Sequence, residues 1–244
     1  MSTTASARPT TPCPDGMAFI PGGTLSTLER GRDVSIDGFC LDLHEISVAE
    51  YRACVREGRC ERACPTCPEV PARTDWRSEE EDAKVSRFCN GGQDDREDHP
   101  VNCVSFDEAA AYCGAHDKRL PSGDEWEWAA TSGPEVRPSP WGTPIVKDEI
   151  CWGKPKKRAG TCARGSHPID LTAQGVAEMG GHVSEWTTPP KRSSTKNPVR
   201  WIYGASWYAI DDGYARAGVG GMQMPARRAE TVGFRCAAAR SGSK

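Results

Sequence analysis

Twelve cysteines in 244 residues constrain this chain more than any other feature of its sequence. Cytosolic proteins keep their thiols reduced, whereas an even and high cysteine count is typical of a disulfide framework formed in an oxidising compartment. We therefore expect an extracytoplasmic protein: secreted, periplasmic or lipid-anchored. The alternative is a zinc site formed by Cys60, Cys64, Cys67 and Cys89. In this set only Cys64 and Cys67 have the C-x2-C spacing that is typical of zinc ligands.

Composition narrows the class of protein further. Hydrophobic residues make up 37% of the chain, with 25 Gly and 19 Pro, so it can bury a core but must form many turns. The net charge is −3 and the basic residues are scattered, which argues against a nucleic-acid partner. No apolar run approaches the ~20 residues that cross a bilayer, so we expect no transmembrane segment.

The order of polar and apolar segments predicts one domain. Residues 1–12 are small and polar, like the flexible stretch that follows an export signal or lipid anchor, and we expect such a signal to be missing here. A domain over 13–240 and a short tail, 241–244, complete the chain. Residues 61–99 are predicted to be an insertion loop whose acidic clusters are solvated, because their spacing does not fit an EF-hand.

Three short helices are predicted by a serine followed three residues later by a glutamate, the pattern of a capping box. The three pairs are Ser47 with Glu50, Ser105 with Glu108, and Ser122 with Glu125. The third helix carries Trp126 and Trp128, which lie on different sides of a helix, so we expect only one of them to face the core.

Short apolar runs predict strands at residues 17–20, 34–36, 200–203 and 232–237. Together with the helices they indicate an α+β protein. Its strands and helices are short, and loops take up much of its length.

Eight short motifs follow one another in an order that is more specific than any single motif. They are GMAFIPGG (16–23), LDLHEIS (41–47), HPVNCVS (99–105), KRLPSGDEWEWA (118–129), PWG (140–142), MGGHVSEW (179–186), GASW (204–207) and VGFRCA (232–237). From about Cys13 to Arg240 this series resembles the formylglycine-generating enzyme family, also called the sulfatase-modifying factor family. The resemblance implies a C-type-lectin-like fold with little regular secondary structure, short antiparallel strands and two to three short helices.

The same resemblance implies a disulfide between Cys113 and Cys236, because the family pairs a cysteine of its second helix with one of its last strand. Cys151 and Cys162 flank a Lys/Arg-rich turn and are our second expected pair. A pairing of Cys13 with Cys40 is a guess, and so is the pairing among Cys54, Cys60, Cys89 and Cys103.

Oxidases of this family hold Cu(I) with two thiolates that are separated by four intervening residues, shortly after a Gly-Gly-Ser-aromatic turn. Residues 204–207 match that turn, and counting forward places Ala209 and Tyr214 at the two thiolate positions. No cysteine occurs between Cys162 and Cys236, so no shift of the alignment restores the pair. We therefore expect no copper site of this kind.

Two other metals follow from the resemblance. His182 and Glu185 match the Asn and Glu of a calcium-binding motif, and imidazole is a poor ligand for calcium, so calcium is a weakened candidate. Related sulfoxide synthases use iron held by three histidines. The five histidines here, 44, 99, 116, 167 and 182, show no H-x3-H spacing, and we expect no iron.

Two functions remain open. We favour a non-catalytic binding or scaffold module, a pseudoenzyme of the family, whose ligand is a peptide, protein or carbohydrate. The alternative is an enzyme of the same family that catalyses a different oxidation or peptide modification. In either case we expect the ligand to meet one group of residues around the GASW turn, namely Trp186, Ser206, Trp207, Asp211, Tyr214 and Arg216.

Overall fold

The computed structural model describes residues 13–26, 33–63, 79–142, 149–153, 160–190, 199–209 and 212–240. Cys64, Cys67 and Asp211 therefore lie outside the described residues. Within the described ranges, every helix is too short or too polar to cross a membrane.

The three predicted helices are confirmed, and each begins with the predicted capping box: α1 (Val48–Arg56), α3 (Phe106–Ala115) and α4 (Gly123–Ala130). In each box the serine side chain accepts from the backbone N–H of the glutamate, whose carboxylate accepts from the serine N–H. A further helix, α2 (Glu79–Ser86), forms in the segment that we predicted to be loop. Single 3-10 turns follow at η1 (Asn90–Gly92), η2 (Gly133–Glu135) and η3 (Asp212–Ala215).

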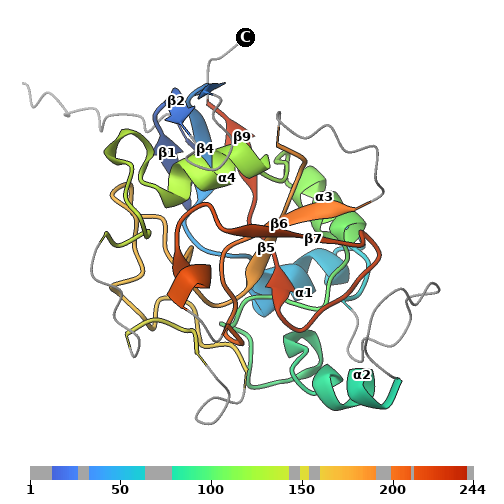
Figure 1. Cartoon of the computed structure of the whole chain (residues 1–244). Coiled ribbons are helices and arrows are strands. Elements are labelled where there is room, and N and C mark those ends of the chain that lie inside the picture. Colours follow the sequence, from blue (N-terminus) through green and yellow to red (C-terminus); the bar gives the residue numbers. More distant parts are fainter. Residues whose placement is uncertain are drawn as a thin grey trace, which may run out of the picture.

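Two small antiparallel sheets form from the N-terminal strands and the end of the chain. The first has the order β1-β4-β9, and the second pairs β2 with β3. The strands are β1 (Met17–Ile20), β2 (Gly23–Ser26), β3 (Asp33–Ile36), β4 (Phe39–Asp42) and β9 (Ala237–Ala239). Figure 1 shows them beside α4 at one end of the molecule, with α2 at the opposite end.

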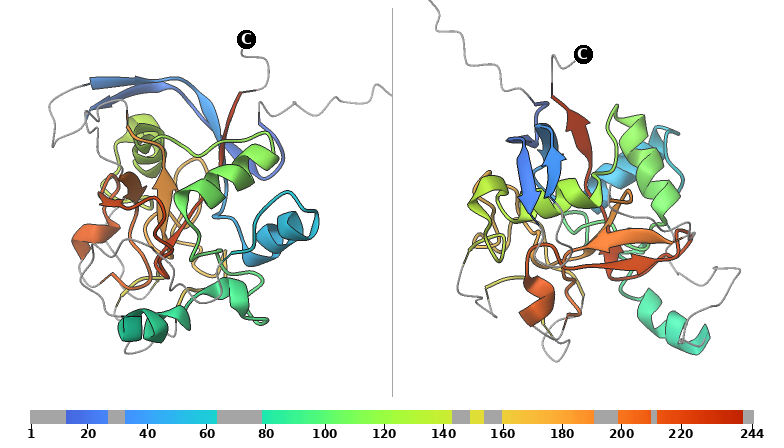
Figure 2. Two further views of the ribbon diagram at one scale, coloured as in Figure 1. Left: turned by 90° about the vertical axis from the view of Figure 1, so that its right-hand side faces the viewer. Right: turned by 45° about the horizontal axis from the view of Figure 1, so that its top comes forward.

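A third sheet lies below the N-terminal strands in Figure 1, and the right-hand view of Figure 2 shows it from another side. Its order is β7-β6-β5-β8, in which only β5 and β8 are parallel. The strands are β5 (Ser184–Thr187), β6 (Arg200–Tyr203), β7 (Gly220–Gln223) and β8 (Val232–Gly233). The single strand that we predicted at 232–237 is therefore wrong, because the chain leaves β8, carries the buried Arg235 between the sheets, and only then enters β9.

The expectation that only one tryptophan of α4 faces the core is also wrong. Trp126 and Trp128 are 0% and 2% exposed, because α4 is covered on more than one side. The ring of Trp126 packs against Tyr203 of β6. Trp128 lies over Gly23, where an added Cβ would meet its ring at 2.6 Å, and donates a hydrogen bond from Nε1 to the carbonyl of Pro21 at 2.7 Å.

Five disulfides stabilise these elements. They join Cys113 to Cys236 and Cys151 to Cys162, the two pairs expected from the sequence, and also Cys13 to Cys40, Cys54 to Cys60, and Cys89 to Cys103. The alternative zinc set loses two of its four members, because Cys60 and Cys89 are disulfide-bonded.

Candidate functional site

The GASW turn and the MGGHVSEW segment lie side by side. The β5–β6 pairing sets Glu185 opposite Tyr203, and the backbone N–H of Trp207 donates to the carbonyl of His182 at 2.7 Å. The two family-like motifs that the sequence analysis singled out therefore form one continuous region. The chemistry of this region depends on which of its side chains remain available.

The two thiolate positions offer no ligand set for copper. Ala209 is partly buried and packs in an apolar cluster with Ile150, Trp152 and Ala215. Tyr214 lies in η3, and its side chain is outside what the structure describes. Every cysteine of the described ranges is in a disulfide, so none of them offers a thiolate to Cu(I).

Two tryptophans that we expected to meet a ligand are core residues instead. Trp186 and Trp207 are 0% and 1% exposed, and their indole N–H groups donate to the carbonyls of Val104 and Glu230. Their full burial leaves no ring face for a ligand, which corrects the sequence-based assignment.

The exposed part of this turn is Tyr208, which sequence reasoning missed. Its side chain is 49% exposed and packs edge-on against Trp207. Arg216, which we did assign, is exposed, whereas Ser206, which we also assigned, is buried, with 9% of its surface exposed. The signal that could have identified Tyr208 is its position directly after the GASW turn.

Glu185 does not meet His182 to form a calcium site. Its carboxylate is fully buried and accepts two hydrogen bonds from Arg235, from Nε at 2.8 Å and from a terminal nitrogen at 2.8 Å. Trp126 Nε1 donates a third, also at 2.8 Å. Calcium needs six to eight oxygen ligands, so an ion-paired carboxylate and an imidazole do not fit it.

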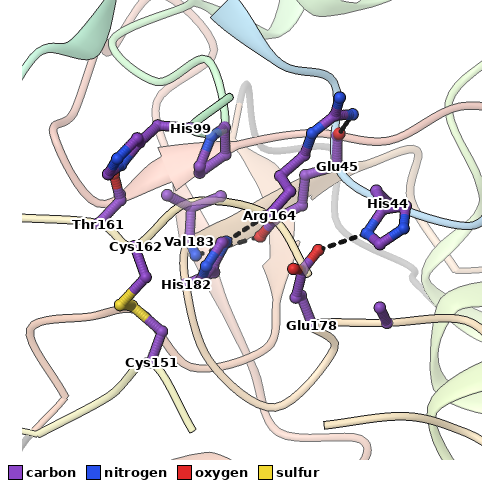
Figure 3. Close-up of polar contacts among 12 residues, drawn as sticks. His44, Glu45, His99, Cys151, Thr161, Cys162, Arg164, Glu178, His182 and Val183 are labelled. Atoms are coloured by element: carbon purple, nitrogen blue, oxygen red, sulfur yellow. Dashed lines mark hydrogen bonds and ion pairs between the residues drawn. A yellow bond between two sulfur atoms is a disulfide. The ribbon is translucent and has the colours of Figure 1, made fainter. Parts of the chain in front are cut away.

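His182 belongs to a buried cluster with Glu45 and Glu178 (Figure 3). His182 Nδ1 is hydrogen-bonded to Oε2 of Glu45 at 2.8 Å, and the N–H of Val183 donates to Oε1 of the same carboxylate at 3.2 Å. Glu178 accepts from His44 Nδ1 at 2.9 Å and from the N–H of Gly165. All four carboxylate oxygens of the cluster are therefore used by protein donors.

Burial and mutual charge set the protonation of this cluster. Burial raises the pKa of Glu45 to about 7, against the opposing effect of His182. Burial also opposes the charge of His182, but the Glu45 carboxylate raises the pKa of that imidazole overall. For Glu178, the His44 hydrogen bond and the His182 charge outweigh burial and lower the pKa to about 2. Glu178 is thus ionised at neutral pH, and the hydrogen bond between Glu45 and His182 links the titration of these two groups.

The backbone in this cluster is held in an uncommon conformation. Glu178 and His182 have φ values of 65° and 66°, in the left-handed region that most side chains avoid. The His182 N–H donates to the carbonyl of Cys151 at 2.8 Å, and the Glu178 N–H to that of Asp170 at 2.9 Å. Strain of this kind persists only where the surrounding structure fixes it, and it is frequent at functional sites.

A cavity lies apart from this cluster, between α1 and η1. Its volume is about 480 Å³, and its lining includes Val48, Arg52, Arg56 and Gly92. Tyr51 contributes a buried hydroxyl that has no hydrogen-bond partner among the described residues. Arg52 is already bonded to the carbonyls of Gly91 and Gln93, so it is a structural part of the wall.

Two groups of side chains in the described ranges could hold a metal ion: Glu45 with Glu178 and His182, and Cys151 with Cys162 and His182. The two groups share His182. Neither is a three-histidine set of the kind expected for iron.

Comparison with known proteins identifies the family. Residues 2–240 match the model described as "Sulfatase-modifying factor enzyme 1-like domain". The chain belongs to this family. The resemblance seen in the motif order is thereby confirmed, and so is the α+β fold with short strands and few helices.

The relatives of this chain include proteins named formylglycine-generating enzyme and proteins whose names call them inactive. The chain is 33% identical over 150 residues to the inactive C-alpha-formylglycine-generating enzyme 2 of Bos taurus, covering 57% of this chain and 50% of that relative. It is 27% identical over 262 residues to the Mus musculus protein of the same name, covering 91% and 85%. It is 28% identical over 262 residues to the formylglycine-generating enzyme of Mus musculus, covering 85% and 68%.

Among solved structures, PvdO from Pseudomonas aeruginosa is similar in fold. The TM-score is 0.65, at 19% identity, over 91% of this chain and 94% of that one. At this identity the likeness concerns the fold alone.

Proposed function

We propose that this member of the sulfatase-modifying factor family is a non-catalytic binding module that acts outside the cytoplasm. The observation that carries the proposal is Ala209, whose methyl group packs in an apolar cluster where an oxidase of this family would present a thiolate. A methyl group cannot bind Cu(I), and the tyrosine at the second position is a weak ligand while its phenol is protonated.

The disulfides support the extracytoplasmic part of the proposal. Ten of the twelve cysteines form five disulfides, a density typical of proteins that fold in oxidising compartments. The relatives named as inactive formylglycine-generating enzymes support the non-catalytic part, at low identity.

For the binding surface we propose the exposed side of the GASW turn. Tyr208 offers a half-exposed aromatic ring on a backbone that is held by the hydrogen bond between Trp207 and His182. A rigid turn that presents an aromatic side chain suits recognition of a peptide, protein or carbohydrate, because little conformational entropy is lost on binding.

The test is an activity assay on the intact chain. Cu(I), oxygen and a peptide containing Cys-x-Pro-x-Arg are supplied, and the mass of the peptide is followed. We expect no loss of mass at the peptide cysteine. Turnover above a control with metal alone would overturn the proposal.

A gain-of-ligand variant provides the matched control. Ala209→Cys with Tyr214→Cys restores both ligand positions, in a background where Cys64→Ser and Cys67→Ser remove the two cysteines outside the described residues. We expect the double variant to bind Cu(I) in competition with a chelator and the background chain to bind it much more weakly. Equal binding would mean that copper ligands lie elsewhere in the chain.

A further inference from the structure

A disulfide lies against the buried histidine. Cys151 and Cys162 face His182, and one ligand atom from each of the three residues lies within 4.8 Å of the others (Figure 3). Cys151 and His182 are 1% exposed, and Cys162 is partly exposed. The two cysteines were expected to pair, but no sequence spacing indicated that His182 lies against them.

The imidazole is oriented for binding through one nitrogen. Glu45 takes the Nδ1 hydrogen bond at 2.8 Å, and its other carboxylate oxygen is held by the N–H of Val183. His182 Nε2 is buried and has no hydrogen-bond partner in the described part of the chain. A proton on Nδ1 leaves a lone pair on Nε2. Metal-ligating histidines are commonly oriented in this way, with one ring nitrogen donating to a carboxylate and the other binding the metal.

The backbone holds this geometry in place. The N–H of His182 donates to the carbonyl of Cys151 at 2.8 Å. Gly181 permits this close approach, because an added Cβ would meet that same carbonyl oxygen at 2.8 Å. On the other side, the His182 carbonyl accepts from the N–H of Trp207 at 2.7 Å. The histidine is thus fixed against the cysteine segment whether or not the sulfur atoms are bonded.

We propose that reduction of the Cys151–Cys162 disulfide creates a Cys2His site for Zn²⁺. A dithiol reductant supplies two electrons and two protons, the sulfur–sulfur bond breaks to give two thiols, and the dithiol becomes a disulfide. Zn²⁺ then displaces the two thiol protons and binds both thiolates and Nε2 of His182. The structure therefore carries a metal site that the disulfide keeps closed.

The chemistry of the three ligands selects the metal. Two thiolates and an imidazole suit Zn²⁺, which takes four tetrahedral ligands with Zn–S near 2.3 Å and Zn–N near 2.0 Å. Two sulfurs on such an ion lie about 3.8 Å apart, within the space that the three groups share. Three protein ligands leave the fourth position to water. The partly exposed Cys162 gives a reductant access to the bond.

The neighbouring Glu45–Glu178–His182 group is a weaker candidate for the same ion. Each of its carboxylate oxygens already accepts a hydrogen bond from the protein. A metal there would have to break those bonds, whereas a metal at Nε2 would satisfy a buried nitrogen that has none.

The test uses the full chain carrying Cys64→Ser and Cys67→Ser, so that these two cysteines cannot compete for metal. The protein is treated with a phosphine reductant, desalted without oxygen, and titrated with Zn²⁺ against a chromogenic chelator and with Co²⁺. We expect one Zn²⁺ per chain after reduction and none before it. Bound Co²⁺ should show the ligand-field absorption of a tetrahedral thiolate site.

Two variants assign the ligands. Cys151→Ser with Cys162→Ser should abolish binding. His182→Asn should weaken Zn²⁺ binding at least ~10-fold, the smallest loss seen when even an outer partner of a ligand is removed. Asparagine tolerates the left-handed backbone at this position, so the variant is suited to fold. Alkylation of Cys151 and Cys162 after reduction verifies that both thiols are free in each sample that contains them.

The matched control removes a different short-range disulfide, with Cys54→Ser and Cys60→Ser, and should bind Zn²⁺ as the parent does. The proposal is overturned if the reduced parent, with both thiols alkylatable, binds no Zn²⁺. It is also overturned if the Cys151→Ser, Cys162→Ser variant binds as tightly as the parent, or if His182→Asn leaves the affinity unchanged.

Discussion

Arg235 and Glu185 form a bidentate ion pair in which both side chains are 0% exposed. The same guanidinium donates to the carbonyls of Asp42 and Ala177, so it joins β4, the loop before β5, and β5 itself. A buried pair contributes little net stability when it is intact, but removing one partner leaves an uncompensated charge.

Replacing Arg235 alone should therefore strongly reduce the stability of the folded protein. Arg235→Met strands the Glu185 carboxylate in the core, and we expect the free energy of unfolding to fall by about 3 to 5 kcal/mol. Urea denaturation under non-reducing conditions measures the change. The double variant Arg235→Met, Glu185→Gln leaves no charge at this buried pair and should be more stable than the single variant. A double variant that is less stable than the single one would show that the charge is not the cause.

Loss of the long-range disulfide should cost more than loss of a short one. Cys113 and Cys236 are 123 residues apart, whereas Cys54 and Cys60 are 6 apart. Cys236→Ser should destabilise the protein by about 2 to 5 kcal/mol and expose Cys113 to alkylation. Cys60→Ser should cost about 2 to 3 kcal/mol less, since its loop restricts the unfolded chain much less. Equal losses in urea denaturation would contradict the chain-entropy explanation.

Two helical glycines should respond to alanine with opposite signs. An added Cβ at Gly123, in the first turn of α4, would meet the ring of Tyr203 at 2.6 Å, so Gly123→Ala should destabilise by about 1 to 3 kcal/mol. Gly114 in α3 has open space around it, and Gly114→Ala should stabilise by about 0.4 to 1 kcal/mol. Thermal denaturation of both variants tests the pair, and a stabilising Gly123→Ala would refute the clash.

Asp170 should make stability fall as pH rises. Burial raises the pKa of its carboxyl from 3.8 to about 7, so the folded protein holds a proton that the unfolded chain releases above about pH 4. The folded state therefore loses stability between about pH 4 and pH 7 by up to about 4 kcal/mol from this group. Asp170→Asn removes the titration and keeps an oxygen for the Gly180 N–H.

Denaturation curves from pH 4 to pH 8 compare the two proteins. Glu45 titrates in the same range, so both curves should slope, but the wild type should slope more steeply. The stability of Asp170→Asn relative to the wild type should rise with pH. Parallel curves would mean that Asp170 is ionised in the folded protein.

Local sequence signals predicted the local structure well. Each capping box, such as Ser122 with Glu125, fixes a helix start through contacts within four residues, so it can be identified from the sequence alone. The burial of both Trp126 and Trp128 could not be predicted in this way, because it depends on packing against β6 and Gly23, which are distant in sequence. The motif order supplied the family, and with it the pairing of Cys113 with Cys236.

For the candidate site, the sequence alone could predict only that the copper-binding cysteines are missing. The absence of a cysteine at position 209 follows from the sequence directly. The contact between Glu45 and His182 spans 137 residues, and the contact between Glu185 and Arg235 spans 50. No periodicity or spacing encodes such contacts. The sequence therefore suggested a calcium role for Glu185 and His182, whereas the fold gives each of them a different partner.

The pairing of both β1 and β9 with β4 has a consequence for engineering. Both strands are antiparallel to β4 and therefore parallel to each other, so the start of β1 and the end of β9 lie about 10 Å apart across the sheet and about 10 Å apart along it. A linker of about five to eight residues could join these two ends. A circular permutant with that linker should fold, provided that its new ends fall in an exposed loop. The domain is likewise suited to insertion as a single cassette into a surface loop of a host protein, where its two ends would replace a short span of the host chain.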